Sequence, residues 1–134
     1  MLGVDTNVLV RFFVRDDEDQ FSQAERLIGG AGSGTLFISP IVMVELNWVL
    51  RRVYRYSRQE VMDVLQGMTE FRQFQLGKRE MITEALSLAS ASGVDFSDAL
   101  IALLDREAGC TATVTFDVRA LRLEQMLAVG EALN

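Results

Sequence analysis

The sequence begins with an apolar run, residues 2–10, that a single carboxylate interrupts at Asp5. Aspartate is a poor strand former and costs free energy to bury without a partner, so its place in this run indicates either a helix cap or a charge that binds something. We expect Leu2, Gly3 and Val4 to form a short buried strand and residues 5–7 to form the turn that leaves it. Polar groups would then stand at the carboxyl end of a strand, where open α/β sheets bind their ligands.

Strand and helix patterns alternate along the rest of the chain. Further strands are predicted at residues 35–38, 71–76 (at a sheet edge), 111–116 and near 127–129. Helices are predicted after the acidic turn 16–19, then over 40–55, 58–68, 79–91 and from about 95 to 108, with a short one from 118. Alternation of this kind predicts a parallel sheet covered by helices on both faces. A length of 134 residues predicts one domain, residues 1–134.

Local signals define several helix ends. Ser39 followed by Pro40 is typical of an N-cap and the first helical position. Ser57 with Glu60 three residues later has the form of a capping box. Asp95 is the best candidate for the cap of the helix that is predicted to be buried through Leu100, Leu103, Leu104 and Ala108, and Gly109 is placed to end that helix.

The composition excludes several kinds of chemistry. The chain has no histidine and one cysteine, Cys110, so catalysis that needs histidine, a zinc site built from histidine and cysteine, and an intrachain disulfide are all excluded. No apolar leader follows a basic start, and the longest apolar stretch, residues 41–50, is too short to span a bilayer. We therefore expect a cytoplasmic protein without a membrane segment. Carboxylates, hydroxyls and arginines remain for chemistry.

Charge is unevenly distributed. The formal net charge is −6, which by itself argues against nonspecific binding to nucleic acid. Residues 51–79 hold seven basic and three acidic side chains, a net charge of +4, which leaves −10 for the remainder. This basic segment either faces phosphates or consists of solvated helix faces.

Four acids stand where surface acids are not expected. Asp5 and Asp117 each follow a predicted strand, Glu45 lies in an apolar helical stretch, and Asp98 is near the start of a buried helix. If the strand at 111–116 is a neighbour of the first strand, Asp5 and Asp117 emerge at the same sheet edge. Clustered carboxylates require a cation between them, and Mg²⁺ with its oxygen ligands suits such a cluster. A site of this kind activates water for phosphodiester hydrolysis.

Each of these acids also has a simpler interpretation. Asp5, Asp98 and Asp117 are candidates for helix caps or first-turn acids, and Glu45 for a side chain that reaches solvent. Thr6 and Thr115 either orient ligands and water or bond the backbone, and the second role is the more common one.

The order of these motifs resembles the PIN domain, and within it the VapC-type toxin ribonucleases of bacterial toxin–antitoxin pairs. The resemblance rests on Asp5-Thr6-Asn7 after an apolar strand, Glu45 after Ser39-Pro40, residues 95–99, and Thr115-Phe116-Asp117. It implies a three-layer α/β/α sandwich with a central, mainly parallel sheet. It also implies RNA cleavage with Mg²⁺ or Mn²⁺, a homodimer and inhibition by a cognate antitoxin.

The resemblance assigns roles to individual residues. Asp5, Glu45, Asp98 and Asp117 match the acidic cluster of the family, and Asp5 and Asp98 would be the primary metal ligands. Thr6 and Thr115 match positions that often line its pocket. Trp48, Val49, Val53 and Tyr54 are candidates for a partner groove or a dimer contact, although core packing is the expected role of Trp48.

Three other functions are compatible with parts of the sequence. A DNA-directed nuclease would use the same acidic site, and a binding module would use its carboxylates only as caps. A phosphoacceptor signalling domain is disfavoured because the one lysine, Lys78, precedes a predicted helix instead of following a strand.

Overall fold

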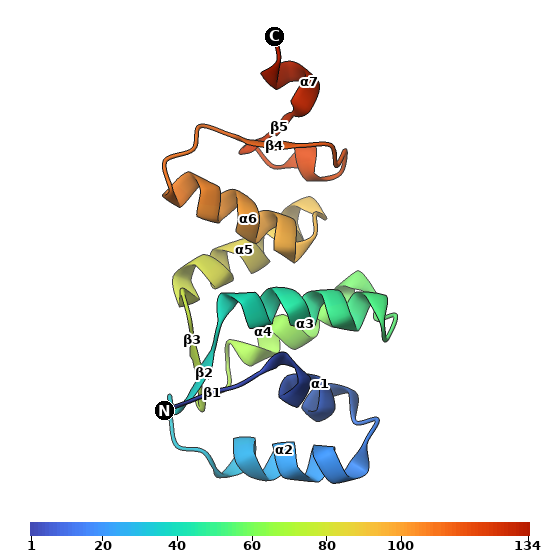
Figure 1. The fold of residues 1–134 in the computed structure, drawn as a ribbon, viewed down its shortest axis with the longest axis vertical. Coiled ribbons are helices and arrows are strands. Elements are labelled where there is room, and N and C mark those ends of the chain that lie inside the picture. The colour runs from blue at the N-terminus through green and yellow to red at the C-terminus, as the bar shows by residue number, and fades with distance from the viewer. The chain divides into compact units, whose positions relative to one another are not determined.

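The computed structural model describes all residues, 1–134, and contains two compact units, Met1–Arg79 and Glu80–Asn134. Figure 1 shows the elements of both units, and we describe each unit by itself. All strand pairs in both units are parallel, as predicted for an α/β protein. None of the helices has the length and apolar character that crossing a bilayer would require.

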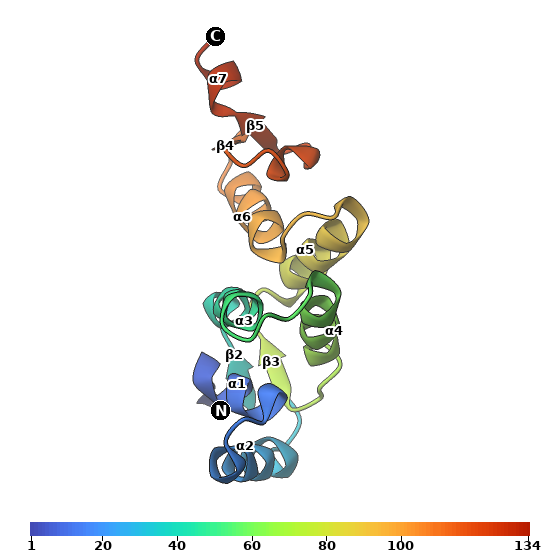
Figure 2. The ribbon, with the colours of Figure 1, turned by 90° about the vertical axis from the view of Figure 1, so that its right-hand side faces the viewer.

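The first unit contains a three-stranded sheet in the order β1-β2-β3. The strands are β1 (Leu2–Gly3), β2 (Leu36–Ile38) and β3 (Phe74–Leu76), and Figure 2 shows β2 and β3 side by side. Leu36 stands opposite Leu2 on one side and Phe74 on the other. The predicted edge position of the 71–76 strand is confirmed within this sheet. Leu36 and Ile38 of the central strand are fully buried because both faces of that strand are covered.

Four helices complete the first unit: α1 (Thr6–Val14), α2 (Glu18–Gly30), α3 (Pro40–Arg52) and α4 (Arg58–Met68). Helix α1 packs against α2 and α3, and α3 packs against α4. The caps agree with the sequence patterns. The Ser39 side chain accepts a hydrogen bond from the Ile41 N–H, and Ser57 and Glu60 form both bonds of the predicted capping box. Helix α3 ends at Arg52, three residues before the predicted end.

Helix α1 was not anticipated from the sequence, which had suggested only a turn after the first strand. The helix forms because Asp5 caps it and because Leu9, Val10, Phe12 and Phe13 recur at helical spacing. Leu9 and Val10 are buried, and Phe12 and Phe13 join an aromatic cluster with Phe21, Phe71 and Phe74. The sequence interpretation stopped at the polar turn and missed this periodicity.

Trp48 does not take the core position that was expected for it. Its side chain is 55% exposed on α3, whereas Met43, Leu46 and Leu50 of the same helix are fully buried. Helical geometry explains the difference, because Trp48 falls on the side of α3 away from these three residues. The expectation of core packing for Trp48 is therefore wrong.

The second unit contains α6 (Phe96–Glu107), β4 (Thr113–Thr115), a short 3₁₀ turn η1 (Ala120–Arg122), β5 (Met126–Ala128) and α7 (Val129–Ala132), preceded by α5 (Arg79–Ser92). Strands β4 and β5 pair in parallel, with Thr113 opposite Met126. The α7 turn had no counterpart in the sequence prediction. The predicted neighbourhood of the first strand and the 111–116 strand concerns both units and stays a prediction.

The two ends of α6 follow the sequence signals closely. Asp95 caps the helix, and its Oδ2 accepts the Ser97 N–H at 2.9 Å. Gly109 adopts φ +97°, and the N–H groups of Gly109 and Cys110 donate to the carbonyls of Arg106 and Asp105 at 3.0 Å each. This pair of bonds is the Schellman motif that a glycine after a helix favours. Ala108, predicted to be buried, is exposed because it is the C-cap residue.

Candidate active site

Asp5 occupies the junction between β1 and α1. Val4 is still bonded to the neighbouring strand, because its N–H donates to the Phe37 carbonyl at 3.0 Å. Asp5 then has extended backbone angles and caps α1, with its Oδ1 accepting the Thr6 N–H at 2.7 Å. The side chain is exposed at the carboxyl end of the strand. Capping is thus one role of Asp5, and the cap bond uses Oδ1 alone.

Thr6 joins Asp5 to the second predicted site residue of this unit. Its side chain is 7% exposed, and its hydroxyl donates to Oε1 of Glu45 at 2.8 Å. The two residues are 39 positions apart, and the bond connects the start of α1 to the second turn of α3. Glu45 therefore stands beside the Asp5 turn with one carboxylate oxygen oriented by a buried hydroxyl.

This bond corrects the expectation for Thr6. The sequence favoured a hydroxyl that bonds the backbone, whereas the structure shows a hydroxyl that orients a candidate metal ligand. The sequence signal for this role is a hydroxyl residue directly after a candidate site aspartate. The sequence does not show that the hydroxyl bonds Glu45, because Glu45 lies on another helix. The Glu45 side chain is exposed to solvent, as the simpler interpretation proposed, and the hydrogen bond from Thr6 fixes one of its carboxylate oxygens.

Asp98 lies in the first turn of α6 and is half-buried. Asp95 supplies the cap of α6, and the Asp98 carboxylate is placed in the first turn, at the positive end of the helix. The sequence assignment of Asp95 as the cap is confirmed. A carboxylate at this end of a helix is compatible with ligand binding.

Asp117 follows β4 after Phe116 and organises the turn into η1. Its Oδ1 accepts the N–H groups of Arg119 at 2.9 Å and Ala120 at 3.3 Å. Its own N–H donates to the Thr115 hydroxyl at 2.9 Å. Asp117 therefore holds the turn that leads into η1, although the N-cap of η1 is Arg119, and the backbone-bonding interpretation of Thr115 is confirmed. Oδ2 of Asp117 takes no part in these bonds.

Two arginines tie the Asp117 turn to the segment that precedes α6. The Arg119 guanidinium donates to the Gly93 carbonyl at 3.4 Å, and that of Arg122 donates to the Ser92 carbonyl at 3.2 Å. These carbonyls lie just before the Asp95 cap of α6. The turn that carries Asp117 and the helix start that carries Asp98 are thus attached to the same connection within the second unit.

Each unit therefore supplies a pair of the predicted carboxylates, at a strand end and on a helix: Asp5 with Glu45 in the first, and Asp117 with Asp98 in the second. Neither unit by itself gathers three or more Asp, Glu or Cys side chains into a group able to hold a metal ion. The ion pairs of the first unit engage other acids, Asp16 and Glu18. Carboxylate oxygens are the ligands that Mg²⁺ and Mn²⁺ prefer, so the residue types fit such an ion.

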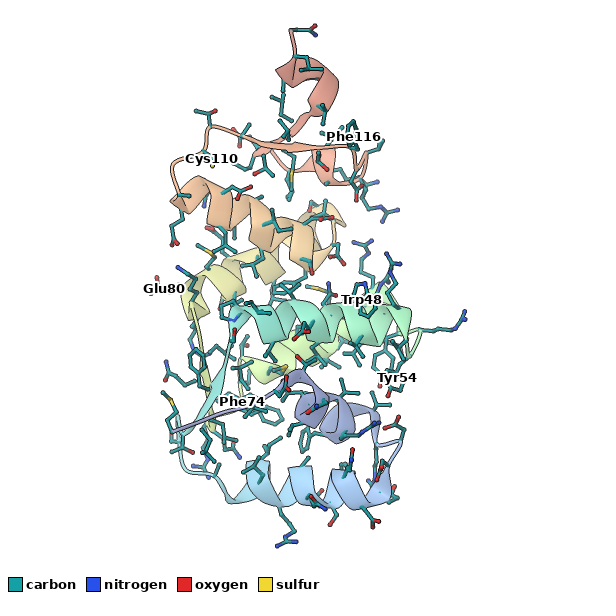
Figure 3. All side chains as sticks on the ribbon, viewed as in Figure 1. Trp48, Tyr54, Phe74, Glu80, Cys110 and Phe116 are labelled. Atoms are coloured by element: carbon teal, nitrogen blue, oxygen red, sulfur yellow. The ribbon has the colours of Figure 1, made fainter.

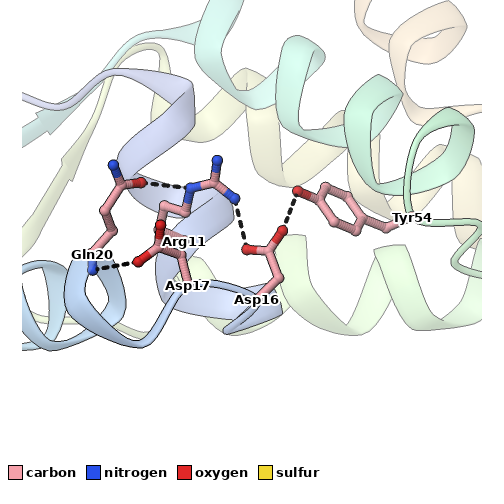
Figure 4. A network of polar contacts seen from close by, with 5 residues as sticks. All are labelled: Arg11, Asp16, Asp17, Gln20 and Tyr54. Atoms are coloured by element: carbon pink, nitrogen blue, oxygen red, sulfur yellow. Dashed lines mark hydrogen bonds and ion pairs between the residues drawn. The ribbon is translucent and has the colours of Figure 1, made fainter.

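A polar network fixes helix α1, which begins at the site. The Arg11 guanidinium donates to Asp16 Oδ1 and to Gln20 Oε1 at 2.7 Å each, and the Tyr54 hydroxyl donates to Asp16 Oδ2 at 2.8 Å (Figure 4). The bonds from Arg11 and Tyr54 lower the pKa of Asp16, and the bond to Asp16 raises the pKa of Tyr54. Arg11 and Gln20 also line a cleft of about 510 Å³ between α1 and α2. Asn7, near the start of α1, lines the same cleft.

Comparison with known proteins identifies one family and one related protein. The sequence is 25% identical over 122 residues to a VapC ribonuclease of Aquifex aeolicus (strain VF5), a match that covers 90% of each chain. The family model of the PIN domain matches residues 3–125, a span that includes the strand ends, both helices and all four carboxylates described above. The chain therefore belongs to the PIN domain family.

Proposed function

We propose that this chain is a metal-dependent endoribonuclease and the toxin of a toxin–antitoxin pair. The observation that supports the proposal is the Thr6–Glu45 hydrogen bond, which joins the Glu45 carboxylate to the residue that follows Asp5 at the carboxyl end of β1. The similarity to a VapC ribonuclease supports RNA as the substrate.

In this proposal Asp5, Glu45, Asp98 and Asp117 serve one reaction. That all four act together is supported by the order of their motifs along the chain and by the extent of the PIN family match. Asp5 and Asp98 would be the primary metal ligands. Glu45 and Asp117 would complete the pocket, bind a second metal ion or hold water. The Thr6 hydroxyl and the Oδ1 atoms of Asp5 and Asp117 would keep their structural hydrogen bonds, while the remaining carboxylate oxygens bind the metal ion.

The ion proposed for the site is Mg²⁺ or Mn²⁺. When bound, such an ion lowers the pKa of a coordinated water and stabilises the charge that develops on a phosphodiester. The contribution of the chain is positional: the cap bond of Asp5 and the turn bonds of Asp117 hold each carboxylate after its strand, and the Thr6 hydroxyl orients Glu45. Fixed ligands reduce the ordering that binding requires.

A cognate antitoxin, a homodimer and a cytoplasmic site of action complete the proposal. The relationship to a VapC ribonuclease supports the antitoxin, since an active ribonuclease requires restraint in the cell that makes it. An inhibitor would present arginine or lysine to the carboxylates, because charge-assisted hydrogen bonds to them are strong.

The decisive experiment is RNA cleavage by the purified chain with Mg²⁺ or Mn²⁺ and with EDTA. We expect cleavage that EDTA abolishes, and a loss of at least about 100-fold in rate for Asp5→Asn and for Asp98→Asn. Asp19→Asn is the matched control, because Asp19 is an exposed acid in the first turn of α2. If both carboxylates serve one reaction, the double variant loses no more than either single one. Full activity in EDTA, or in Asp5→Asn, would refute the proposal.

Two additional measurements separate the alternatives. Cleavage of single-stranded DNA or branched duplexes in preference to RNA would identify a DNA nuclease with the same acidic site. A folded chain that binds no Mn²⁺ in a calorimetric titration would instead support a binding module whose carboxylates only cap helices.

A further inference from the structure

Helix α3 presents an exposed row of chemically different side chains. Glu45, Trp48 and Arg52 are all exposed, and their spacing of three and four residues places them on one side of the helix. In Figure 3, Trp48 lies toward the end of α3 that leads into the α3–α4 connection. At 1.5 Å per residue, the row covers about 10 Å from Glu45 to Arg52.

This row continues into a concentrated positive charge. Four arginines lie at the end of α3, in the connection and at the start of α4: Arg51, Arg52, Arg55 and Arg58. No acid occurs in the sequence between Glu45 and Glu60. We name residues 51–58 the basic turn. Two acids contact the basic turn: Asp16 accepts a hydrogen bond from Tyr54 and is itself paired with Arg11, and Glu60 accepts the Ser57 N–H in the capping box. Four arginines within eight residues are a local concentration of positive charge in a chain with a net charge of −6.

Arg55 adds a second, conformational observation. Its φ angle is 58°, in the left-handed region that glycine and asparagine adopt more easily than arginine. The side chain is exposed at this position, so packing does not require an arginine there. Arg15 and Lys78 share this conformation, and at Arg55 it holds a large, exposed basic side chain at a tight turn.

We propose that Trp48 and the basic turn bind single-stranded RNA that leads to or from the acidic site at Glu45. Bases stack on exposed aromatic rings, and arginines neutralise the phosphates, which together is the usual chemistry of single-strand binding. Trp48 supplies the ring, and Arg52 and Arg55 supply the charges. The inference rests on the proposed function, which makes the acidic site at Glu45 the place where the bound strand is cut.

The chain offers a direct probe, because Trp48 is the only tryptophan. We expect a 12-nucleotide single-stranded RNA to quench the Trp48 fluorescence, measured in EDTA to prevent cleavage. The dissociation constant, measured by anisotropy of a labelled RNA, is expected to rise about tenfold in Trp48→Ala and to change little in Trp48→Phe, because one stacked base is lost in the first variant alone. Because Trp48→Phe keeps an aromatic ring, it separates stacking from general damage to the fold.

The charges are tested through the salt dependence. For single strands, log K falls with log salt concentration by about 0.7 for each phosphate that is neutralised, so the double variant Arg52→Gln/Arg55→Gln is expected to lower the slope by about 1.4. Arg26→Gln is the matched control, since Arg26 is an exposed arginine of α2 outside the basic turn. An unchanged slope and affinity in the double variant would overturn the inference.

The outcomes distinguish this inference from the proposed function. RNA that quenches Trp48 but is not cleaved with Mg²⁺ or Mn²⁺ supports the surface and refutes the nuclease. RNA that is cleaved, with neither quenching nor an effect of Trp48→Ala on affinity, refutes the surface alone. If Trp48 fluorescence instead depends on protein concentration, and Trp48→Ala abolishes a dimer in sedimentation without changing RNA affinity, the row is a contact between copies and the inference is wrong.

Discussion

Replacing Thr6 by valine tests the bond on which the candidate site depends. Thr6 is 7% exposed and its hydroxyl donates to the Glu45 carboxylate at 2.8 Å. Valine has nearly the same shape, so the packing is kept and the hydrogen bond is lost. Bonds to charged groups contribute about 1.5–3 kcal/mol, but Glu45 is exposed and water replaces part of the interaction, so we expect about 1 kcal/mol. For a chain of this size that lowers Tm by about 4 °C.

The assay is thermal and urea denaturation followed by circular dichroism. Thr6→Ser is the control, because it keeps the hydroxyl and is expected to recover most of the lost stability. A double-mutant cycle of Thr6→Val with Glu45→Ala isolates the pair and is expected to give a coupling energy of about 1 kcal/mol. A coupling below about 0.3 kcal/mol, or a Thr6→Ser variant as unstable as Thr6→Val, would show that the hydroxyl does not hold Glu45.

Three other substitutions have expected outcomes. Asp16→Asn lowers the free energy of unfolding at pH 6, because the bonds from Arg11 and Tyr54 to the Asp16 carboxylate are weakened. These bonds lower the pKa of Asp16 in the folded chain, so the difference in stability between variant and parent is lost as the pH falls from the ordinary pKa of 3.8 through the lower folded pKa. Denaturation measured as a function of pH would show this. Gly109→Ala lowers the free energy of unfolding by about 1 kcal/mol in urea, because φ is +97° although no atom obstructs a Cβ there. Ser57→Ala costs about 1 kcal/mol by the same measurement, since the capping box is lost. Unchanged stability in any of the three contradicts the corresponding contact.

The candidate site shows why capping and ligand binding need not be alternatives. Asp5 and Asp117 each use one carboxylate oxygen, Oδ1, to hold the N–H groups of a following turn. The cap orients the side chain, and the second oxygen keeps its lone pairs for a ligand. Bonds of this kind at a strand end would hold the proposed metal ligands in place, so the structural role and the proposed role of these residues do not compete.

The sequence by itself determined the alternating strands and helices, the parallel pairing and most helix ends. Ser39, Ser57, Asp95 and Gly109 act through bonds to backbone groups only a few residues away, so their patterns are sufficient to predict them. Helix α1 was missed because the polar turn at its start concealed an apolar period that was present in the sequence.

Only the tertiary structure decided how Thr6 and Glu45 meet and which side of α3 stays exposed. The Thr6–Glu45 bond joins residues 39 positions apart, and it depends on how α1 packs against α3. The exposure of Trp48 likewise depends on which face of α3 the other elements cover. Local chemistry specifies caps and turns, whereas contacts between distant residues arise from packing geometry that no short pattern contains.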